Sequence, residues 1–222
     1  CAENIACTSG ADYTVKTWDV EKGACKLTVE GHTGLINCVD WNFDGSLMAS
    51  ICKDKKLRVM DPRQQKCVET VGSGLGLRGG RCVFLGRKEK IFSCGFNGYR
   101  QYSVWDPRSM SAPLIKSTRI DNSSGNLMVF YDQDCDILYM SGKGDGNVRY
   151  YEITDDEKII YYISEYKTST PTAGCAMMPK RAMNVNNNEV CRLYKLHRTT
   201  VEPLSFTVPR KSDMFADDIF ID

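Results

Sequence analysis

One stretch of the chain, residues 31–61, contains three short apolar runs separated by polar turns at regular spacing. It reads GHTGLINCVDWNFDGSLMASICKDKKLRVMD. The runs are Ile36–Trp41, Leu47–Cys52 and Leu57–Met60, each rich in β-branched or other apolar residues. Short runs of this kind bounded by turn residues predict strands, and three in succession predict an antiparallel meander. The stretch therefore constrains the fold to small antiparallel sheets.

The third apolar run of this stretch, which ends at Met60, has counterparts elsewhere in the chain. The residues that correspond to Met60 are Trp18, Trp105 and Tyr151, and the four lie at intervals of 42, 45 and 46 residues. A period of about 40–45 residues is typical of WD repeats, in which four strands form one blade of a β-propeller. We therefore predict an all-β fold, a partial WD40-type propeller of about four and a half blades.

The repeat period predicts the boundaries of the domain. Residues 1–208 would form the partial propeller, with blades near 1–29, 30–71, 72–116, 117–166 and 167–208. In the weaker fifth unit we expect a short strand at Ala182–Val185, the Trp-equivalent strand at Val190–His197 and an outer strand at Leu204–Val208. Residues 209–222 show no strand alternation, and their apolar residues predict an extension that packs on the propeller.

WD repeats can contain a hydrogen-bonded chain of imidazole, strand hydroxyl, turn carboxylate and strand Trp. The central copy has Met60 in the Trp position, so its network should be incomplete and less stabilising than a full one. A structural role for these residues is favoured over a catalytic one. The network candidates over all copies are His32, Ser50, Asp54, Thr8, Asp12, Trp18, Trp105 and Asp145.

Composition excludes several classes of protein. A formal net charge of +1 argues against nucleic-acid binding through bulk positive charge. No run reaches the roughly 18 apolar residues of a membrane span. The eleven cysteines form no C-x-x-C pair and fit small buried side chains in a reducing compartment. His32 and His197 are far apart, so we predict no metal and no cofactor.

Catalytic motifs are missing from the sequence. It contains no G-x-S-x-G elbow and no Walker loop, and we predict that the chain is not an enzyme. The glycine-rich segment Gly72–Gly80 could cradle a phosphate only if a helix followed it. Because Arg81–Gly86 is strand-like, a flexible loop between strands is favoured.

Four segments resemble coronins, the WD-repeat proteins of the actin cytoskeleton, and the resemblance covers essentially the whole chain. The segments are Ser141–Asp145 followed by Val148–Tyr150, then Met178–Arg181, Cys191–His197 and Thr207–Phe215. The last run is one that ordinary WD proteins lack. Coronins have seven blades, then a variable region and a coiled coil, so the resemblance implies a stretch from the third blade to just after the seventh. Family contacts made by the first blade or by the coiled coil would not be carried over.

The resemblance implies a non-enzymatic binder of actin filaments, in the cytoplasm at the actin cytoskeleton and cell cortex, that touches the actin-branching complex. Filaments are acidic, so exposed basic side chains should contact them. The candidates form two clusters: Lys53, Lys55, Lys56, Arg58, Arg63 and Lys66, and Lys180, Arg181, Lys195, Arg198, Arg210 and Lys211. Two alternatives remain open: solvated turn faces without a partner, and a WD40 scaffold for a peptide or protein other than actin.

A partial propeller would leave strand edges and blade faces open to water. Apolar faces of that size mark association surfaces. We therefore expect a homodimer in which two chains close one ring of about nine blades through two equivalent joints. The alternative is a monomer with frayed ends.

Overall fold

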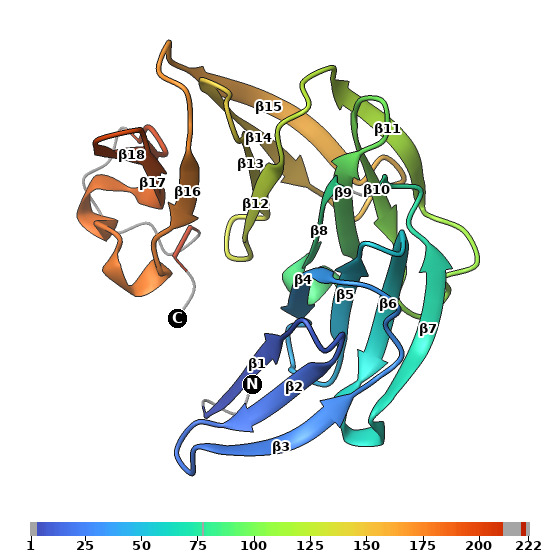
Figure 1. Ribbon diagram of the computed structural model, residues 1–222. Helices are drawn as coiled ribbons and strands as arrows, with labels where there is room; N and C mark the ends of the chain where they lie inside the picture. Colours follow the sequence, from blue (N-terminus) through green and yellow to red (C-terminus); the bar gives the residue numbers. More distant parts are fainter. Residues whose placement is uncertain (1–3, 77, 211–218, 221–222) are drawn as a thin grey trace. The chain divides into compact units, whose positions relative to one another are not determined.

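The computed structural model describes residues 4–76, 78–210 and 219–220 (Figure 1). Within these residues it contains eighteen strands and four one-turn 3-10 helices. The strands form five antiparallel sheets, which confirms the predicted all-β class. The chain divides into two compact units, Cys1–Leu127 and Met128–Asp222.

The first unit holds three sheets, each a meander of neighbouring strands. The first sheet contains β1 (Ile5–Ser9), β2 (Val15–Asp19) and β3 (Ala24–Val29). The second contains β4 (Ile36–Trp41), β5 (Met48–Cys52), β6 (Lys56–Asp61) and β7 (Lys66–Gly72), with η1 (Pro62–Gln64) between β6 and β7. The third contains β8 (Arg78–Phe84), β9 (Ile91–Phe96), β10 (Arg100–Trp105) and β11 (Ile115–Asp121), with η2 (Gly86–Lys88) between β8 and β9.

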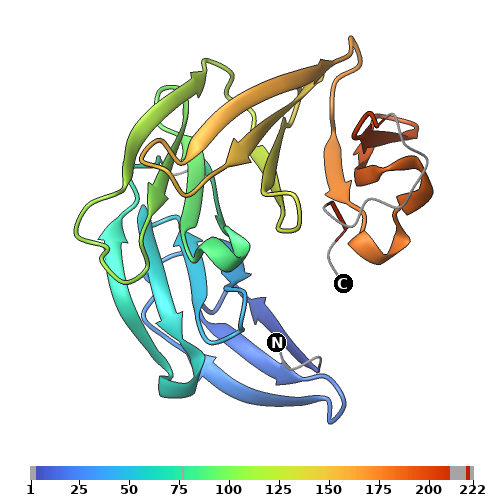
Figure 2. The same ribbon diagram turned by 180° about the vertical axis from the view of Figure 1, so that it is seen from behind.

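The fourth and fifth sheets are also meanders of neighbouring strands, which Figure 2 shows from behind. The fourth sheet contains β12 (Leu127–Asp132), β13 (Ile137–Gly142), β14 (Asn147–Ile153) and β15 (Ile160–Lys167). The fifth contains β16 (Gly174–Met177), β17 (Glu189–Leu196) and β18 (Val201–Thr207), with η3 (Lys180–Ala182) and η4 (Val185–Asn187) between β16 and β17.

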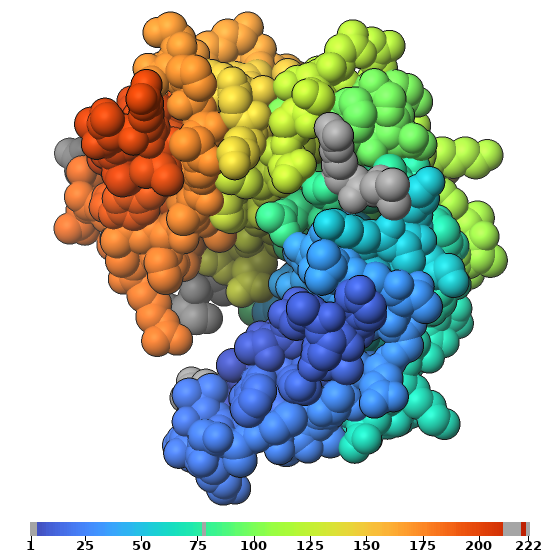
Figure 3. All heavy atoms as spheres, in the orientation of Figure 1, coloured from blue at the N-terminus to red at the C-terminus, as the bar shows by residue number. Residues whose placement is uncertain are grey.

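In the first unit, the apolar core lies between neighbouring sheets. Val15 of the first sheet packs with Met48 and Met60 of the second, and all three are fully buried. Ile51 of the second sheet shares a larger cluster with Phe84 and Trp105 of the third. In Figure 3 the dark blue atoms of the first sheet lie directly against the lighter blue atoms of the second. Neighbouring sheets of the first unit therefore bury their facing side chains against each other.

The fifth sheet differs from the prediction. No strand forms at Ala182–Val185, where η3 and η4 make a long connection between β16 and β17. Because β15 is the fourth strand of its own sheet, β16 begins the next one. The strand predicted at Val190–His197 is β17 and takes the second position, so its assignment to the Trp-bearing third position was wrong. The predicted outer strand is β18, in the third position.

The glycine-rich segment Gly72–Gly80 leads into a strand, β8, and not into a helix. It also packs tightly. A Cβ atom added at Gly80 would lie 2.5 Å from Cγ2 of Ile51, and one added at Gly76 would lie 2.3 Å from the Phe96 carbonyl oxygen. The glycines thus allow close approach of the segment to the second and third sheets.

Part of the C-terminal extension lies outside the described residues. Ile219 is described, is buried, and packs in a small cluster with Val190. The Cys135 thiol donates to its carbonyl oxygen at 3.7 Å. The packing of the rest of the extension stays a prediction.

Candidate functional site

The turn between β5 and β6 carries three exposed lysines, Lys53, Lys55 and Lys56. Lys55 has a left-handed φ of 65°, and its N–H donates to the Cys52 carbonyl oxygen at 3.1 Å. The Lys55 carbonyl oxygen accepts from the N–H and the hydroxyl of Ser73, at 2.8 and 2.9 Å. These bonds fix the backbone, so the three ammonium groups project from a rigid support.

The carboxylate of this turn, Asp54, accepts hydrogen bonds from Arg58 and Thr33. Arg58 donates from Nη1 to Oδ1 at 3.1 Å and from Nη2 to Oδ2, while the Thr33 hydroxyl donates to Oδ2 at 2.9 Å. Burial acts to raise the pKa of Asp54, but the bonds from Arg58 and Thr33 outweigh it and hold that pKa well below its usual range. Because Arg58 balances Asp54, the lysines give the turn a net positive charge.

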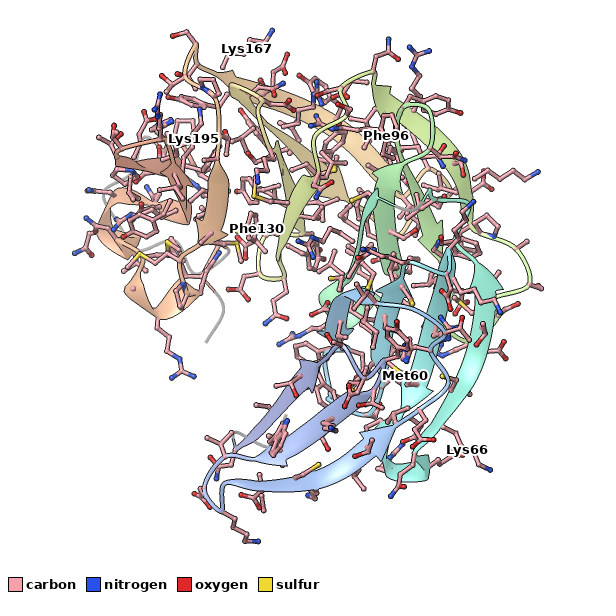
Figure 4. All side chains as sticks on the ribbon, viewed as in Figure 1. Met60, Lys66, Phe96, Phe130, Lys167 and Lys195 are labelled. Atoms are coloured by element: carbon pink, nitrogen blue, oxygen red, sulfur yellow. The ribbon has the colours of Figure 1, made fainter. Side chains whose placement is uncertain are left out.

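Two of the predicted basic contacts are not on exposed loops. The Arg58 side chain is 3% exposed and forms an ion pair with Asp54. Lys195 is fully buried in β17 (Figure 4), where Nζ donates to the Thr170 carbonyl oxygen at 2.8 Å, and burial lowers its pKa. The expectation that these two side chains reach a partner from exposed loops is therefore corrected.

The first predicted cluster separates into two groups. Lys56 pairs with Gly72 at one end of β6, and Lys66 pairs with Asp61 at the other end. Figure 4 shows Lys66 at the start of β7, away from the β5–β6 turn. Arg63 lies at this second end and is held by the Asp61 carboxylate, with Nε 3.0 Å from Oδ1. Arg63 and Lys66 are thus separated from the lysines of the β5–β6 turn by the length of β6.

The second predicted cluster is also divided. Arg181 is exposed in η3, before β17 begins, whereas Arg198 is exposed in the turn after β17 ends. Lys180 is half-buried and donates from Nζ to Asp132 Oδ2 at 2.5 Å and to the Val190 carbonyl oxygen at 2.8 Å. Arg210 is exposed after β18, and Lys211 lies outside the described residues. The structure does not bring this cluster together on one surface.

The central polar network is partly formed. His32 Nε2 and Ser50 Oγ are 2.8 Å apart, and the Ser50 hydroxyl contacts Met60 Sδ at 4.0 Å. His32 Nδ1 is buried and has no hydrogen-bond partner among the described residues, and the Asp54 carboxylate is bonded to Arg58. Burial and the nearby Arg58 charge lower the pKa of His32 to about 4. The imidazole is therefore neutral and structural.

The Trp-bearing copies show the predicted link more clearly. Trp18 Nε1 donates to the Thr8 hydroxyl at 2.7 Å, and Trp105 Nε1 donates to Ser93 at 2.9 Å. Ser93 was not predicted, although it precedes Trp105 much as Thr8 precedes Trp18. Asp12 is not part of this hydrogen-bonded network, since its carboxylate accepts from Lys16 Nζ at 2.7 Å.

The fourth copy, with Tyr151 in the Trp position, has a looser network. The Ser141 hydroxyl is buried without a partner among the described residues. Asp145 joins the loop through its backbone, since its N–H donates to the Gly142 carbonyl oxygen at 3.0 Å and its carbonyl oxygen accepts from Thr172 at 2.8 Å.

Among the described residues, no group of three or more His, Cys, Asp or Glu side chains could hold a metal ion. Residues 4–76, 78–210 and 219–220 also contain no helix that is long and apolar enough to cross a membrane. A cavity of about 230 Å³ opens in the first unit. Its lining includes Asn42, Leu47, Phe84, Glu89 and Arg108.

Comparison with known proteins agrees with this architecture. Residues 23–61 match the family described as "WD domain, G-beta repeat", and residues 201–222 match a "Type of WD40 repeat". The solved WD40 domain of Toxoplasma gondii coronin superposes with a TM-score of 0.90 at 29% identity, over 98% of this chain and 57% of that one.

Sequence relatives carry the same name. The chain is 46% identical over 203 residues to Coronin-A of Dictyostelium discoideum, covering 90% of this chain and 45% of the relative. It is 39% identical over 228 residues to Coronin-2A of Homo sapiens, covering 99% of this chain and 43% of the relative. The chain thus spans less than half the length of these relatives. With the five WD40-type sheets, these matches show that the chain belongs to the coronin family and corresponds to part of its WD40 domain.

Proposed function

We propose that this chain is a non-enzymatic, actin-filament-binding part of a coronin, and that the β5–β6 turn contacts the filament. The observation that carries the proposal is the rigid turn with three exposed lysines, Lys53, Lys55 and Lys56. Its one carboxylate, Asp54, is already paired with Arg58. An acidic filament would therefore meet three lysines on a turn whose own carboxylate is already neutralised.

The physical consequence is a contact governed by electrostatics. Positive charge on a fixed turn accelerates encounter with an acidic surface and sets the orientation of docking. Such charges are exposed, so added salt should screen them. Arg181 and Arg198 are further candidates, but they lie at opposite ends of β17 and would act as separate contacts.

Co-sedimentation with actin filaments tests this proposal. The variant with Lys53→Glu, Lys55→Glu and Lys56→Glu should bind on the order of tenfold more weakly, because it reverses the charge of the turn. Arg63→Glu with Lys66→Glu is the control, since it reverses two charges at the far end of the same sheet. Equal binding by the wild type and the turn variant would remove the turn from the contact.

Family membership supports two further proposals about the cellular setting. The chain acts in the cytoplasm at the actin cytoskeleton and cell cortex, and the whole protein contacts the actin-branching complex. A tagged chain expressed in cells should follow the distribution of filaments, and the turn variant should follow it less closely. A uniform distribution of the wild-type chain would contradict this placement.

A second candidate function is a scaffold for a peptide or protein other than actin. The cavity in the first unit favours it, because apolar Leu47 and Phe84 lie beside polar Asn42, Glu89 and Arg108. That mixture suits one side chain of a peptide partner. A pull-down that enriches another protein but not actin, and loses it with Leu47→Asp, would favour the scaffold.

The partial propeller closed by a second copy is a separate proposal. Its support is that the first and fifth sheets contain three strands within the described residues, whereas the others contain four. Two chains joined at these sheets would form a homodimer with about nine blades. Sedimentation equilibrium tests it: a mass near twice 25.0 kDa is expected, and the mass of a single chain would contradict it.

A further inference from the structure

Two cysteines from neighbouring sheets meet inside the first unit. Cys38 lies on β4 and Cys82 on β8, and these strands contact each other although they belong to different sheets (Figure 1). The Cys38 thiol donates to the Cys82 carbonyl oxygen at 3.3 Å. The contact places the reactive atom of one cysteine against the backbone of the other.

The two strands are held in this register by polar contacts on both sides of the cysteines. Arg81 Nη1 donates to the Asn37 carbonyl oxygen at 2.5 Å, and the Phe84 N–H donates to Asp40 Oδ2 at 2.7 Å. The cysteines therefore meet at a fixed point of the seam between the second and third sheets.

The surroundings favour a reaction between these two thiols. Cys82 is 4% exposed and belongs to the apolar cluster of Ile51, Phe84 and Trp105, and Cys38 packs against the same cluster. Cys38 is only half-buried, so a small oxidant can reach it, whereas Cys82 is screened from solvent. All ten cysteines within the described residues are free thiols.

The electrostatic setting distinguishes the two thiols. Contact with the side chain and the backbone of Cys82, helped by the positive charge of Arg81, lowers the pKa of Cys38 against the opposing effect of burial. The contact with Cys38, together with burial, raises the pKa of Cys82 well above its usual value. Cys38 is therefore the thiol that ionises first, and thiolates are the form that reacts with oxidants.

We propose that Cys38 and Cys82 form a peroxide-sensitive dithiol site that closes to a disulfide between β4 and β8. The Cys38 thiolate attacks one peroxide oxygen: an S–O bond forms, the O–O bond breaks, and hydroxide leaves and takes up a proton as water. The Cys82 sulfur then attacks the Cys38 sulfenic acid: an S–S bond forms, the S–O bond breaks, and a second water leaves with the Cys82 proton. Two thiols are oxidised, and one hydrogen peroxide is reduced.

The disulfide would fasten the second sheet to the third. It would join two residues that are far apart in the unfolded chain, which restricts that state. The oxidised chain should therefore unfold at a higher temperature than the reduced chain, and dithiothreitol should reverse the difference.

The full chain tests the proposal. The folded protein is treated with hydrogen peroxide, remaining thiols are blocked with N-ethylmaleimide, and tryptic peptides are measured by mass spectrometry. Trypsin gives Leu27–Lys53 with Cys38 and Cys52, Cys82–Arg87 with Cys82 alone, and Ile91–Arg100 with Cys94. We expect the first two peptides to be joined, with a loss of two hydrogen atoms, and the link to disappear after reduction.

Matched variants identify the partners. Cys38→Ser should abolish the link to Cys82–Arg87, whereas Cys52→Ser and Cys94→Ser should retain it. Circular dichroism before oxidation shows whether each variant is folded. If a variant does not fold, the linked peptides of the oxidised wild type identify the two cysteines. Unlinked, blocked Cys82 in the oxidised wild type, or a link from Cys82 to Cys94, would overturn the proposal.

Discussion

Arg58 donates to both carboxylate oxygens of Asp54, four residues earlier in the chain, and neutralises the only acidic group of the β5–β6 turn. This ion pair has two consequences. It leaves His32 Nδ1 without the turn carboxylate as a partner, and it leaves the charge of the three neighbouring lysines uncompensated. The same residue pair thus connects the incomplete polar network with the proposed filament contact.

The first prediction concerns this ion pair. Arg58→Met should lower the free energy of unfolding by about 2 kcal/mol, because it leaves the largely buried Asp54 carboxylate without its charged partner. Urea denaturation measures the change. Arg63→Met is the control, since Arg63 is 70% exposed and its pair with Asp61 should contribute less than about 1 kcal/mol. Equal effects in the two variants would contradict the role of burial at Arg58.

The second prediction concerns pH. The pKa of His32 is lowered to about 4 in the folded chain, against about 6.5 in an unfolded one. Between these values the unfolded state binds more protons at this residue, so the free energy of unfolding should fall as pH falls from about 6.5 to about 4. His32→Gln can keep a bond to Ser50 without titrating, and should lose this part of the pH dependence. Identical pH profiles of the urea midpoint would exclude His32 as its source.

The third prediction concerns close packing of the glycine-rich segment. Gly80→Ala should lower stability by about 1–3 kcal/mol, because the added Cβ would lie 2.5 Å from Cγ2 of the buried Ile51. Gly72→Ala tests the same segment where nothing lies within 4 Å of the added atom, and it should change little. Thermal unfolding distinguishes them. A Gly80→Ala protein as stable as the Gly72→Ala protein would show that the segment can shift to accommodate the added atom without loss of stability.

The fourth prediction compares two copies of the same link. Ser93→Ala should cost about 1–2 kcal/mol, since it leaves the buried Trp105 indole N–H without its acceptor. Thr8→Ala removes the equivalent acceptor of Trp18, but that pair is solvent-accessible and water can replace the hydroxyl. The loss at Thr8 should therefore be smaller in urea denaturation. A larger loss at Thr8 would contradict the importance of burial.

Much of the fold followed from repeat spacing. The interval between Trp18, Met60, Trp105 and Tyr151 reflects one four-stranded unit, and strands end close to each of these residues. The fifth unit was harder, because no marker residue fixes its register. The pattern predicts a strand inside the segment that forms the long connection with η3 and η4, and this extra strand moves β17 by one position in the predicted sheet.

The candidate site was less predictable, because nearness in sequence does not place basic residues on one surface. Lys56 and Lys66 are near in sequence, but β6 and β7 place them at opposite ends of a sheet. Strand alternation indicates burial at Lys195, because this residue shares a buried face of β17 with Cys191 and Leu193. At Arg58 the signal was its position across a tight turn from Asp54, which repeats the spacing of Lys16 and Asp12.

If the positive charge of the β5–β6 turn binds the filament, co-sedimentation should depend strongly on salt. Binding of the wild type, of the triple Lys53→Glu, Lys55→Glu, Lys56→Glu variant and of the Arg63→Glu, Lys66→Glu control is measured between about 50 and about 200 mM salt. We expect the wild type and the control to bind alike and to weaken together as salt rises, while the turn variant binds weakly at low salt and changes little. Three superimposable binding curves would contradict a filament contact at the turn.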